Sequence, residues 1–245
     1  MRTVKQRHMD QLAAHVRGLY REPQLRQLFL ELTLQCNERC FHCGSSCAPG
    51  RREDLLSLEE YRAILEQVKE DFDLTRLQLG ITGGEPLLRR DIMEAAGKKP
   101  GILFPIFTNG TYMDERYFTL FDKCRNLFPV MSIEGDQETT DARRGDGIYD
   151  KLIANMDALH ERNLLFGASV TVTTENIREV TSPEFLKVLT GRGCKLVIYV
   201  EFVPVTDEAR HLAPGDAERA YLMSAMDELR EVVPDTILLS FPGDE

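Results

Sequence analysis

Three cysteines in one short segment are the residues of this chain most suited to chemistry. Cys36, Cys40 and Cys43 follow the spacing C-x3-C-x2-C. Thiolates this close together can hold an iron–sulfur cluster from a single loop, and an ordinary [4Fe–4S] cluster is closed by four of them. Because the motif supplies three, a cluster here would leave one iron for a ligand other than these cysteines.

A fourth thiol and an imidazole lie near the motif and leave other metal sites open. Cys47 could complete a four-thiolate zinc or iron–sulfur site. His42 is another candidate ligand, although as the neighbour of Cys43 we expect it to point the other way. A structural cysteine cluster without a metal is a further alternative. Spacing alone favours the open three-cysteine cluster over zinc.

A second candidate site is the segment Gly83-Gly84-Glu85-Pro86. Adjacent glycines at the end of a strand allow a ligand to approach the backbone closely. Exposed carbonyl groups there would accept hydrogen bonds, and Glu85 adds a carboxylate, so the segment suits an ammonium group. The alternative is an ordinary Gly-Gly turn with a solvated glutamate.

Both motifs follow apolar runs that have the length of buried strands. Seven such runs are predicted as strands, at residues 28–35, 76–82, 102–107, 129–134, 165–174, 195–203 and 236–241. Helical patterns come between them, at residues 57–71, 89–96, 114–124, 148–162, 182–190 and 216–231. This alternation predicts one α/β domain with a parallel sheet wrapped in helices. An open doubly wound sheet and a barrel both fit the pattern.

The unusual residues gather at the ends of the predicted strands. The cysteines follow the first strand, Gly83-Gly84-Glu85 the second and Thr108-Asn109-Gly110 the third, while Ser132-Ile133-Glu134 ends the fourth. In parallel α/β folds the carboxyl ends of the strands share one face, and active sites form there. We therefore expect these four segments to contribute to a single site.

The composition limits the classes of function. The chain has 245 residues and a formal net charge of −10, with 30 Lys and Arg against 40 Asp and Glu. Nucleic-acid binding draws on Lys and Arg contacts to phosphate, so we expect no nucleic-acid partner. No apolar run approaches the ~20 residues that span a bilayer, and residues 1–8 lack a signal-peptide core. We expect a cytoplasmic protein without membrane contact, in which clustered cysteines bind metal rather than form disulfides.

Taken together, the two motifs resemble those of the radical S-adenosylmethionine (SAM) superfamily. The resemblance rests on C-x3-C-x2-C after the first predicted strand and G-G-E-P after the second, and it covers about residues 28–205. It implies a partial (β/α)6 TIM-like barrel, an α/β fold of parallel strands with an outer layer of helices. It also implies a [4Fe–4S] cluster on Cys36, Cys40 and Cys43, with the amino and carboxylate groups of SAM on the fourth iron.

The resemblance further assigns the loops after the second and third strands to SAM. Gly83, Gly84 and Glu85 match the motif that holds the SAM amino group. Thr108 and Asn109 would line the pocket. These residues are therefore expected to be cofactor-binding.

Later strand ends supply the other contacts that the resemblance implies. Ser132 and Glu134 stand where the family places polar side chains against the ribose. Arg144 matches a basic position that pairs with the SAM carboxylate, and Arg143 is the alternative. Three residues near the fifth strand end could reach SAM or substrate, or could reflect only strand propensity and a turn: Thr171, Thr173 and Asn176.

The implied activity is one-electron reduction of the cluster, which cleaves SAM to methionine and a 5′-deoxyadenosyl radical that abstracts hydrogen from a substrate. The cofactor does the difficult chemistry and the protein positions it. The resemblance implies a peptide, protein or cofactor precursor as substrate, and a flavodoxin or ferredoxin as electron donor. The alternative is a non-enzymatic zinc- or iron–sulfur-binding interaction module with Cys47 as fourth ligand. A nucleotide-binding enzyme without a cluster would need a phosphate-binding loop, and neither G-x-G-x-x-G nor a Walker A motif is present.

We expect three parts along the chain: an amphipathic helical extension at 1–26, a radical SAM core at 27–235, and the start of a C-terminal extension at 236–245. Glu31-Leu32-Thr33 and Phe107-Thr108-Asn109-Gly110 resemble the SPASM-type maturases of peptides and cofactors, which append a cysteine-rich domain. Only two cysteines follow the first loop, Cys124 and Cys194, and we expect both to be buried and inert. The sequence is therefore expected to be a core cut from a longer protein.

Overall fold

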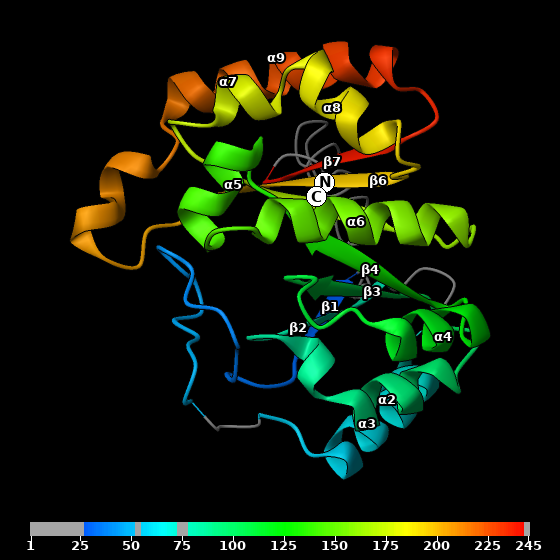
Figure 1. Ribbon diagram of the computed structural model, residues 1–245. Coiled ribbons are helices and arrows are strands. Elements are labelled where there is room, and N and C mark those ends of the chain that lie inside the picture. The colour runs from blue at the N-terminus through cyan, green and yellow to red at the C-terminus, as the bar shows by residue number, and fades with distance from the viewer. Residues whose placement is uncertain (1–26, 52–54, 73–77, 243–245) are drawn as a thin grey trace, which may run out of the picture.

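The computed structural model describes residues 27–51, 55–72 and 78–242. Its centre is a sheet of seven parallel strands in sequence order, curled like part of a barrel and covered on its outer side by helices (Figure 1). From β1 to β7 the strands are Gln27–Glu31, Gln78–Thr82, Phe104–Thr108, Leu127–Ser132, Gly167–Val172, Leu196–Glu201 and Ile237–Phe241. The predicted α/β partial barrel is confirmed, and the sequential strand order excludes the doubly wound alternative.

Helices connect the strands and form the outer layer. They are α2 (Leu58–Asp71), α3 (Arg90–Gly97), α4 (Glu115–Lys123), α5 (Gln137–Arg144), α6 (Ile148–Glu161), α7 (Ile177–Val180), α8 (Pro183–Thr190) and α9 (Asp216–Val232), with short 3₁₀ helices η1 (Pro86–Leu88) and η2 (Asp207–Leu212). In Figure 1 α2, α3 and α4 lie toward one side of the sheet, α7, α8 and α9 toward the other, and α6 between them.

The strands bury side chains on both faces, because successive residues of a strand point to opposite sides. In β4, Leu127 and Met131 pack in the main core with the helices, whereas Phe128 and Val130 belong to a second apolar cluster. Ile198 of β6 joins this second cluster, which contains only residues of strands. Burial on both sides explains why the strands read as continuous apolar runs.

Helix α2 begins where the sequence predicts. Ser57 accepts a hydrogen bond from the backbone N–H of Glu60 at 3.1 Å, and the Glu60 carboxylate accepts one from the backbone N–H of Ser57 at 2.8 Å. This reciprocal capping box gives hydrogen-bond acceptors to the backbone N–H groups of Ser57 and Glu60, which have no acceptor within the helix. The cap fixes the point at which the chain returns from the cysteine loop to the outer layer.

Helix α5 was not predicted. Its sequence is polar and Thr140 is its one buried residue among those described, so it has no apolar stripe to signal a helix. Asp136 starts it by accepting a hydrogen bond from the backbone N–H of Thr139 at 2.9 Å. This missed helix carries both Arg143 and Arg144.

Four strands, β1, β4, β5 and β6, end earlier than predicted, whereas β2 and β7 end at the predicted residue and β3 ends one residue later. The predicted strand 28–35 ends at Glu31, although Leu32 still donates its N–H to the carbonyl of Thr82 at 3.0 Å. The expected boundary at residue 235 does not coincide with an edge of the sheet, because β7 pairs with β6 along its length. The domain limits stay predictions, and the predicted helical extension at 1–26 lies outside the described residues.

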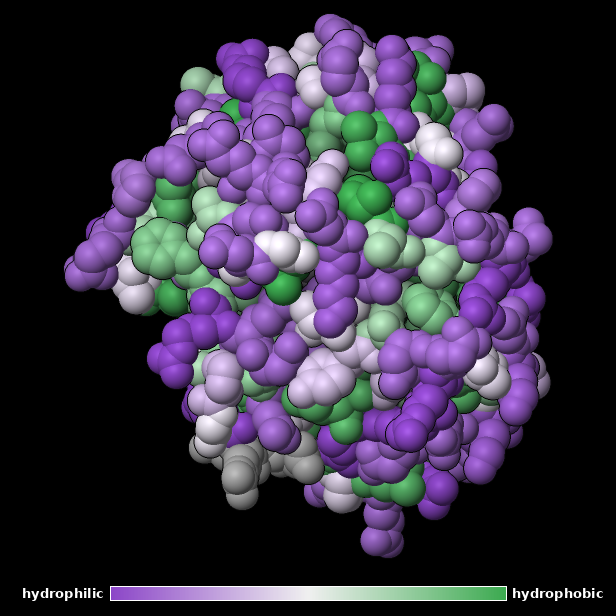
Figure 2. Space-filling view, viewed as in Figure 1, coloured by the Kyte–Doolittle hydropathy of each residue, from purple (hydrophilic) through white to green (hydrophobic). Residues whose placement is uncertain are grey.

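The helix-covered face is mostly hydrophilic, with apolar side chains in small separate groups (Figure 2). Among the described residues, no helix combines the length and apolar character needed to cross a membrane.

Candidate active site

The two glycines after β2 bring its loop directly against the chain that leads to the cysteines. Gly84 donates its N–H to the carbonyl of Thr33 at 2.7 Å, and Glu85 donates to that of Gln35 at 2.9 Å. A Cβ at Gly84 would overlap the carbonyl oxygen of Gln35, and Gly83 has a φ of +142° that disfavours other residues. From the sequence, the two glycines are expected to let a ligand approach the backbone closely. In the structure the segment that approaches is residues 33–35.

Glu85 is fully buried and ties the end of β2 to the end of β3. One carboxylate oxygen accepts hydrogen bonds from the backbone N–H of Leu87 at 2.9 Å and the Thr108 hydroxyl at 2.7 Å. The other accepts from the backbone N–H of Asn109 at 2.8 Å. Burial raises the pKa of Glu85 to about 7, against the opposing effect of these three neutral donors.

The sulfur atoms of Cys36 and Cys40 have different hydrogen-bond partners. Cys36 is buried and accepts hydrogen bonds from the backbone N–H of Glu38 at 3.4 Å and the Asn109 side-chain amide at 3.8 Å. Cys40 instead donates its S–H to a Glu38 carboxylate oxygen at 3.5 Å. Burial raises the pKa of Cys36, and it raises that of Cys40 to about 12. Both thiols hold their protons at neutral pH, so a metal group must displace those protons when it binds.

The cysteines face a hollow that suits a cluster better than a single ion. Cys40, Cys43 and Cys47 line a cavity of about 680 Å³ together with Arg143 and Arg144. Within the described residues, no three His, Cys, Asp or Glu side chains converge closely enough to hold one metal ion. A cubane spreads its thiolates over separate irons, whereas tetrahedral zinc draws four ligands to one point. Three thiols on one loop are the donors that a [4Fe–4S] cluster takes, so the donor set fits this group.

The end of β4 places a carboxylate between two guanidinium groups. Glu134 is 1 % exposed, and its carboxylate accepts hydrogen bonds from Arg143 Nη1 at 2.9 Å and Arg144 Nε at 2.9 Å. Arg144 Nη2 binds the same carboxylate. The Nε of Arg143 is buried without a partner, so a carboxylate ligand beside it would satisfy an orphaned donor.

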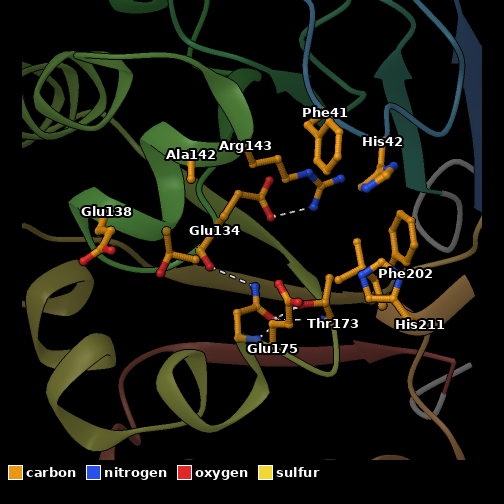
Figure 3. A pocket seen from close by; sticks show the side chains of 13 residues that line it. Phe41, His42, Glu134, Glu138, Ala142, Arg143, Thr173, Glu175, Phe202 and His211 are labelled. Atoms are coloured by element: carbon orange, nitrogen blue, oxygen red, sulfur yellow. Dashed lines mark hydrogen bonds and ion pairs between the residues drawn. The ribbon is translucent and has the colours of Figure 1, made fainter. Parts of the chain in front are cut away.

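A second hollow of about 490 Å³ adjoins the first (Figure 3). Its lining combines acidic, basic and aromatic residues: Phe41, His42, Glu134, Glu138, Thr139, Ala142, Arg143, Thr173, Glu175, Asn176, Phe202, His211 and Leu212. Phe41, His42, Ala142 and Arg143 line both hollows, so the two hollows adjoin along these four residues. The ring centroid of His42 lies 3.7 Å from that of Phe41 and 6.0 Å from that of Phe202.

Asn176 connects the loops after β4 and β5. Its amide nitrogen donates to the backbone carbonyls of Glu134 and Thr171, both at 2.9 Å. Its amide oxygen accepts from the backbone N–H of Thr173 at 2.8 Å and the Thr173 hydroxyl at 3.1 Å. The side chain thus uses its two donors and both lone pairs within the protein. Asn176 and Thr173 line the hollow as parts of its wall, and Thr171 contributes a backbone carbonyl.

The structure brings together part of the predicted site. Cys40, Cys43, Glu134, Arg143, Arg144, Thr173 and Asn176 line the two hollows, with Cys36 buried beside them. Gly83, Gly84, Glu85, Thr108, Asn109 and Ser132 line neither of these two hollows. His42 was expected to point away, but a left-handed backbone with φ of +59° turns it into both. Of the two later cysteines, Cys194 is buried as expected, whereas Cys124 is only partly buried.

Several lining residues were not predicted. Phe202 and His211 come from the segment after β6, and Glu138 comes from α5. Phe41 was visible as an aromatic residue between two cysteines, and its side chain is 66 % exposed. Its place among the candidate ligand cysteines is the sequence signal that could have identified Phe41 as a lining residue of the hollow.

Comparison with known proteins places these residues in a family. The model of the radical SAM superfamily matches residues 30–186, more than half of the chain. An AdoMet-dependent heme synthase of Methanosarcina barkeri is 27 % identical over 198 residues, which cover 79 % of this chain and 56 % of the relative. A pre-heme d1 synthase of Dinoroseobacter shibae is 29 % identical over 201 residues, covering 81 % of this chain and 48 % of the relative.

The fold is also similar to that of solved structures. Streptococcus suis SuiB bound to S-adenosylmethionine superposes with a TM-score of 0.73 at 16 % identity, covering 98 % of this chain and 56 % of SuiB. A second structure of SuiB holds the precursor peptide SuiA. The chain spans about half the length of the curated relatives it matches.

A [4Fe–4S] cluster and SAM are the cofactors of the matched family, and they agree with the three-cysteine motif and with the two joined hollows. The chain belongs to the radical SAM superfamily.

Proposed function

We propose that this protein is a radical SAM enzyme whose active site is the pair of joined hollows at the carboxyl ends of the strands. The observation that carries the proposal is their shared border: cysteines line one hollow, Glu134 and Asn176 line the other, and Arg143 lines both. A cluster in the first hollow and a nucleoside in the second would then lie on either side of this shared border. SAM joins an amino acid to a nucleoside. Its amino acid part could bind beside the cluster, and its nucleoside part could occupy the second hollow.

In this proposal Cys36, Cys40 and Cys43 hold the cluster. The thiols of the buried Cys36 and the partly buried Cys40 would give up their protons to the solvent as the cluster binds. Cys47 also lines the hollow, but we place it outside the ligand set because the fourth iron is needed for SAM. When bound, the reduced cluster supplies the electron that cleaves SAM to methionine and a 5′-deoxyadenosyl radical.

The amino acid end of SAM is assigned to the boundary between the hollows. Arg143 has a buried Nε without a partner, which supports it as the donor to the SAM carboxylate. Arg144 makes two contacts with Glu134 and would help to keep that carboxylate in place. Gly83, Gly84 and Glu85 line neither hollow, and they are proposed to serve the SAM amino group indirectly, by holding the β2 loop against residues 33–35.

The nucleoside end is assigned to the second hollow. Glu134 is proposed to contact the ribose, and Ser132, which lines neither hollow, is proposed to support it from the end of β4. Thr108 and Asn109 also line neither hollow and are proposed to support the pocket from β3 through their hydrogen bonds to Glu85. The low exposure of Glu134 and Asn176, 1 % and 5 %, supports a wall that keeps water from the reacting atoms.

The substrate is proposed to be a cofactor precursor or a peptide. The first class is supported by two relatives that are 27 % and 29 % identical and are named for heme-type products. The second is supported by fold similarity to SuiB, which binds a precursor peptide. A flavodoxin or ferredoxin is the proposed electron donor, since the cluster needs one electron for each cleavage.

Anaerobic reconstitution with iron and sulfide tests the function. We expect a brown protein that, once reduced, shows the electron paramagnetic resonance (EPR) signal of a [4Fe–4S] cluster and converts SAM to 5′-deoxyadenosine. Cys40→Ala should abolish both properties, and the matched variant Cys47→Ala should retain both. A colourless protein that binds zinc stoichiometrically, and loses it in Cys47→Ala, would contradict the proposal in favour of the metal-binding module.

A further inference from the structure

The side chain of Asn109 donates a hydrogen bond to a sulfur atom that the proposed function assigns to the cluster. Its Nδ2 lies 3.8 Å from Cys36 Sγ and 3.0 Å from the side-chain oxygen of Asn37. Asn109 and Cys36 are 6 % and 7 % exposed. Little water competes for this N–H···S contact, so it has more electrostatic weight than it would at the surface.

The orientation of this amide is fixed by its neighbours. The backbone N–H of Thr111 donates to Asn109 Oδ1 at 2.9 Å, and a backbone N–H can only donate. The atom that faces Thr111 must therefore be the oxygen, and the atom that faces Cys36 must be the nitrogen. A flipped amide would turn its oxygen toward the sulfur and toward the oxygen of Asn37.

A side-chain triad holds that orientation. The Thr111 hydroxyl donates to Asn109 Oδ1 at 2.7 Å and accepts a hydrogen bond from the Asn37 amide at 2.7 Å. The backbone of Asn109 is fixed separately by its hydrogen bond to Glu85. Asn37 and Thr111 therefore hold the Asn109 amide in place, from the two loops that follow β1 and β3.

A hydrogen bond to a ligand sulfur changes the energy of the two cluster charges unequally. The reduced cluster carries one more negative charge, and an N–H dipole directed at its sulfur stabilises that state more than the oxidised one. Hydrogen bonds to the sulfurs are among the factors that set the reduction potential of iron–sulfur clusters. Cys36 receives two such bonds, from Asn109 and from the backbone N–H of Glu38.

We propose that Asn37 and Thr111 are positioning residues that hold the Asn109 amide against the Cys36 sulfur, and that this contact raises the reduction potential of the cluster. The proposal rests on the proposed function, because it takes Cys36 as a cluster ligand. It gives Asn109 a contact with the cluster in place of the general pocket-lining role that the sequence suggests.

A redox titration of the reconstituted protein without SAM, followed by EPR of the reduced cluster, tests this assignment. Asn109→Leu removes the donor, Thr111→Val removes the hydroxyl that orients it, and Thr111→Ser keeps that hydroxyl. At the wild-type midpoint we expect the ratio of reduced to oxidised cluster to fall about tenfold in Asn109→Leu, which is 59 mV for one electron. We expect a fall of about threefold in Thr111→Val and no change in Thr111→Ser.

Iron content per chain is measured for each variant, so that a change in potential is separated from incomplete assembly. Wild-type midpoints in both Asn109→Leu and Thr111→Val, with full clusters, would overturn the inference and leave the proposed function intact. If Asn109→Leu does not assemble a cluster, the midpoint potentials of Thr111→Val and Thr111→Ser are compared instead. A lower midpoint in Thr111→Val alone supports the inference, and equal midpoints overturn it. A wild-type protein that assembles no cluster would overturn the proposed function, and this inference with it.

Discussion

Two buried carboxylates stand at the ends of β2 and β4, on either side of β3, and they are held in opposite ways. Glu85, after β2, accepts hydrogen bonds from three neutral donors of the chain. Glu134, after β4, accepts from two guanidinium groups. Each is at most 1 % exposed, so the difference between them is one of partners and not of burial.

The partners determine what each carboxylate can do. Two of the three donors to Glu85 are backbone N–H groups, which cannot move without moving η1 or the end of β3. The donors to Glu134 are long side chains of α5, which can turn toward an arriving anion. We infer that Glu85 is a brace of the cysteine-side half of the site, whereas the Glu134 pair can rearrange when a ligand carboxylate binds.

The largest effect is expected from removing the brace. Glu85→Ala leaves the donors of Leu87, Thr108 and Asn109 buried without an acceptor, at roughly 1–3 kcal/mol for each such group before relaxation. We expect a loss of about 4 kcal/mol in the free energy of unfolding, measured by urea denaturation of the cluster-free protein. Glu85→Gln keeps one acceptor oxygen and should recover about half. Equal stability of Glu85→Ala and wild type would show that Glu85 is not a brace.

The second effect is a pH dependence of stability that Glu85 supplies. Its pKa is raised from 4.5 to about 7 in the folded protein, so between these values the unfolded chain loses the proton while the folded protein keeps it. Stability from this group is therefore greatest below pH 4.5, falls as the pH rises, and is constant again above about 7. At 1.36 kcal/mol for each unit, the fall is about 3 kcal/mol.

Urea denaturation of wild type and Glu85→Gln at several pH values isolates this group, because glutamine does not titrate. The stability advantage of wild type over Glu85→Gln should shrink by about 3 kcal/mol between pH 4.5 and 7.5. An advantage that stays constant across this range would mean that Glu85 ionises alike in both states.

The difference between the two carboxylates also explains what the sequence could predict. The seven strands follow from apolar runs, and the start of α2 follows from Ser57 and Glu60, because these signals are local. The cysteine motif and Gly83-Gly84 are likewise short segments that can be recognised in isolation. Such patterns were sufficient for the fold class, and they predict a site at the strand ends.

Contacts between distant segments could not be predicted in the same way. The donors to Glu85 from Thr108 and Asn109 lie 23 and 24 residues away, so no local pattern reveals that its carboxylate is already bound. Helix α5 lacks an apolar stripe, and thus both arginines were recognised without the helix that directs them to Glu134. Phe202 and His211 line the same hollow although they are nine residues apart, so no local pattern in the sequence reveals that they meet there.

The smallest effect is expected from the pair that can rearrange. Glu134→Ala removes the partner of Arg143 and Arg144, but both guanidiniums border a hollow, and their side chains are 19 % and 10 % exposed. Water can therefore resolvate them in part, and we expect a loss of about 2 kcal/mol, below the 3–5 kcal/mol of a fully enclosed pair. Urea denaturation beside Glu85→Ala gives the comparison directly. If Glu134→Ala costs as much as Glu85→Ala, the arginine pair is as rigid as the brace, and a ligand carboxylate could not displace Glu134 from it.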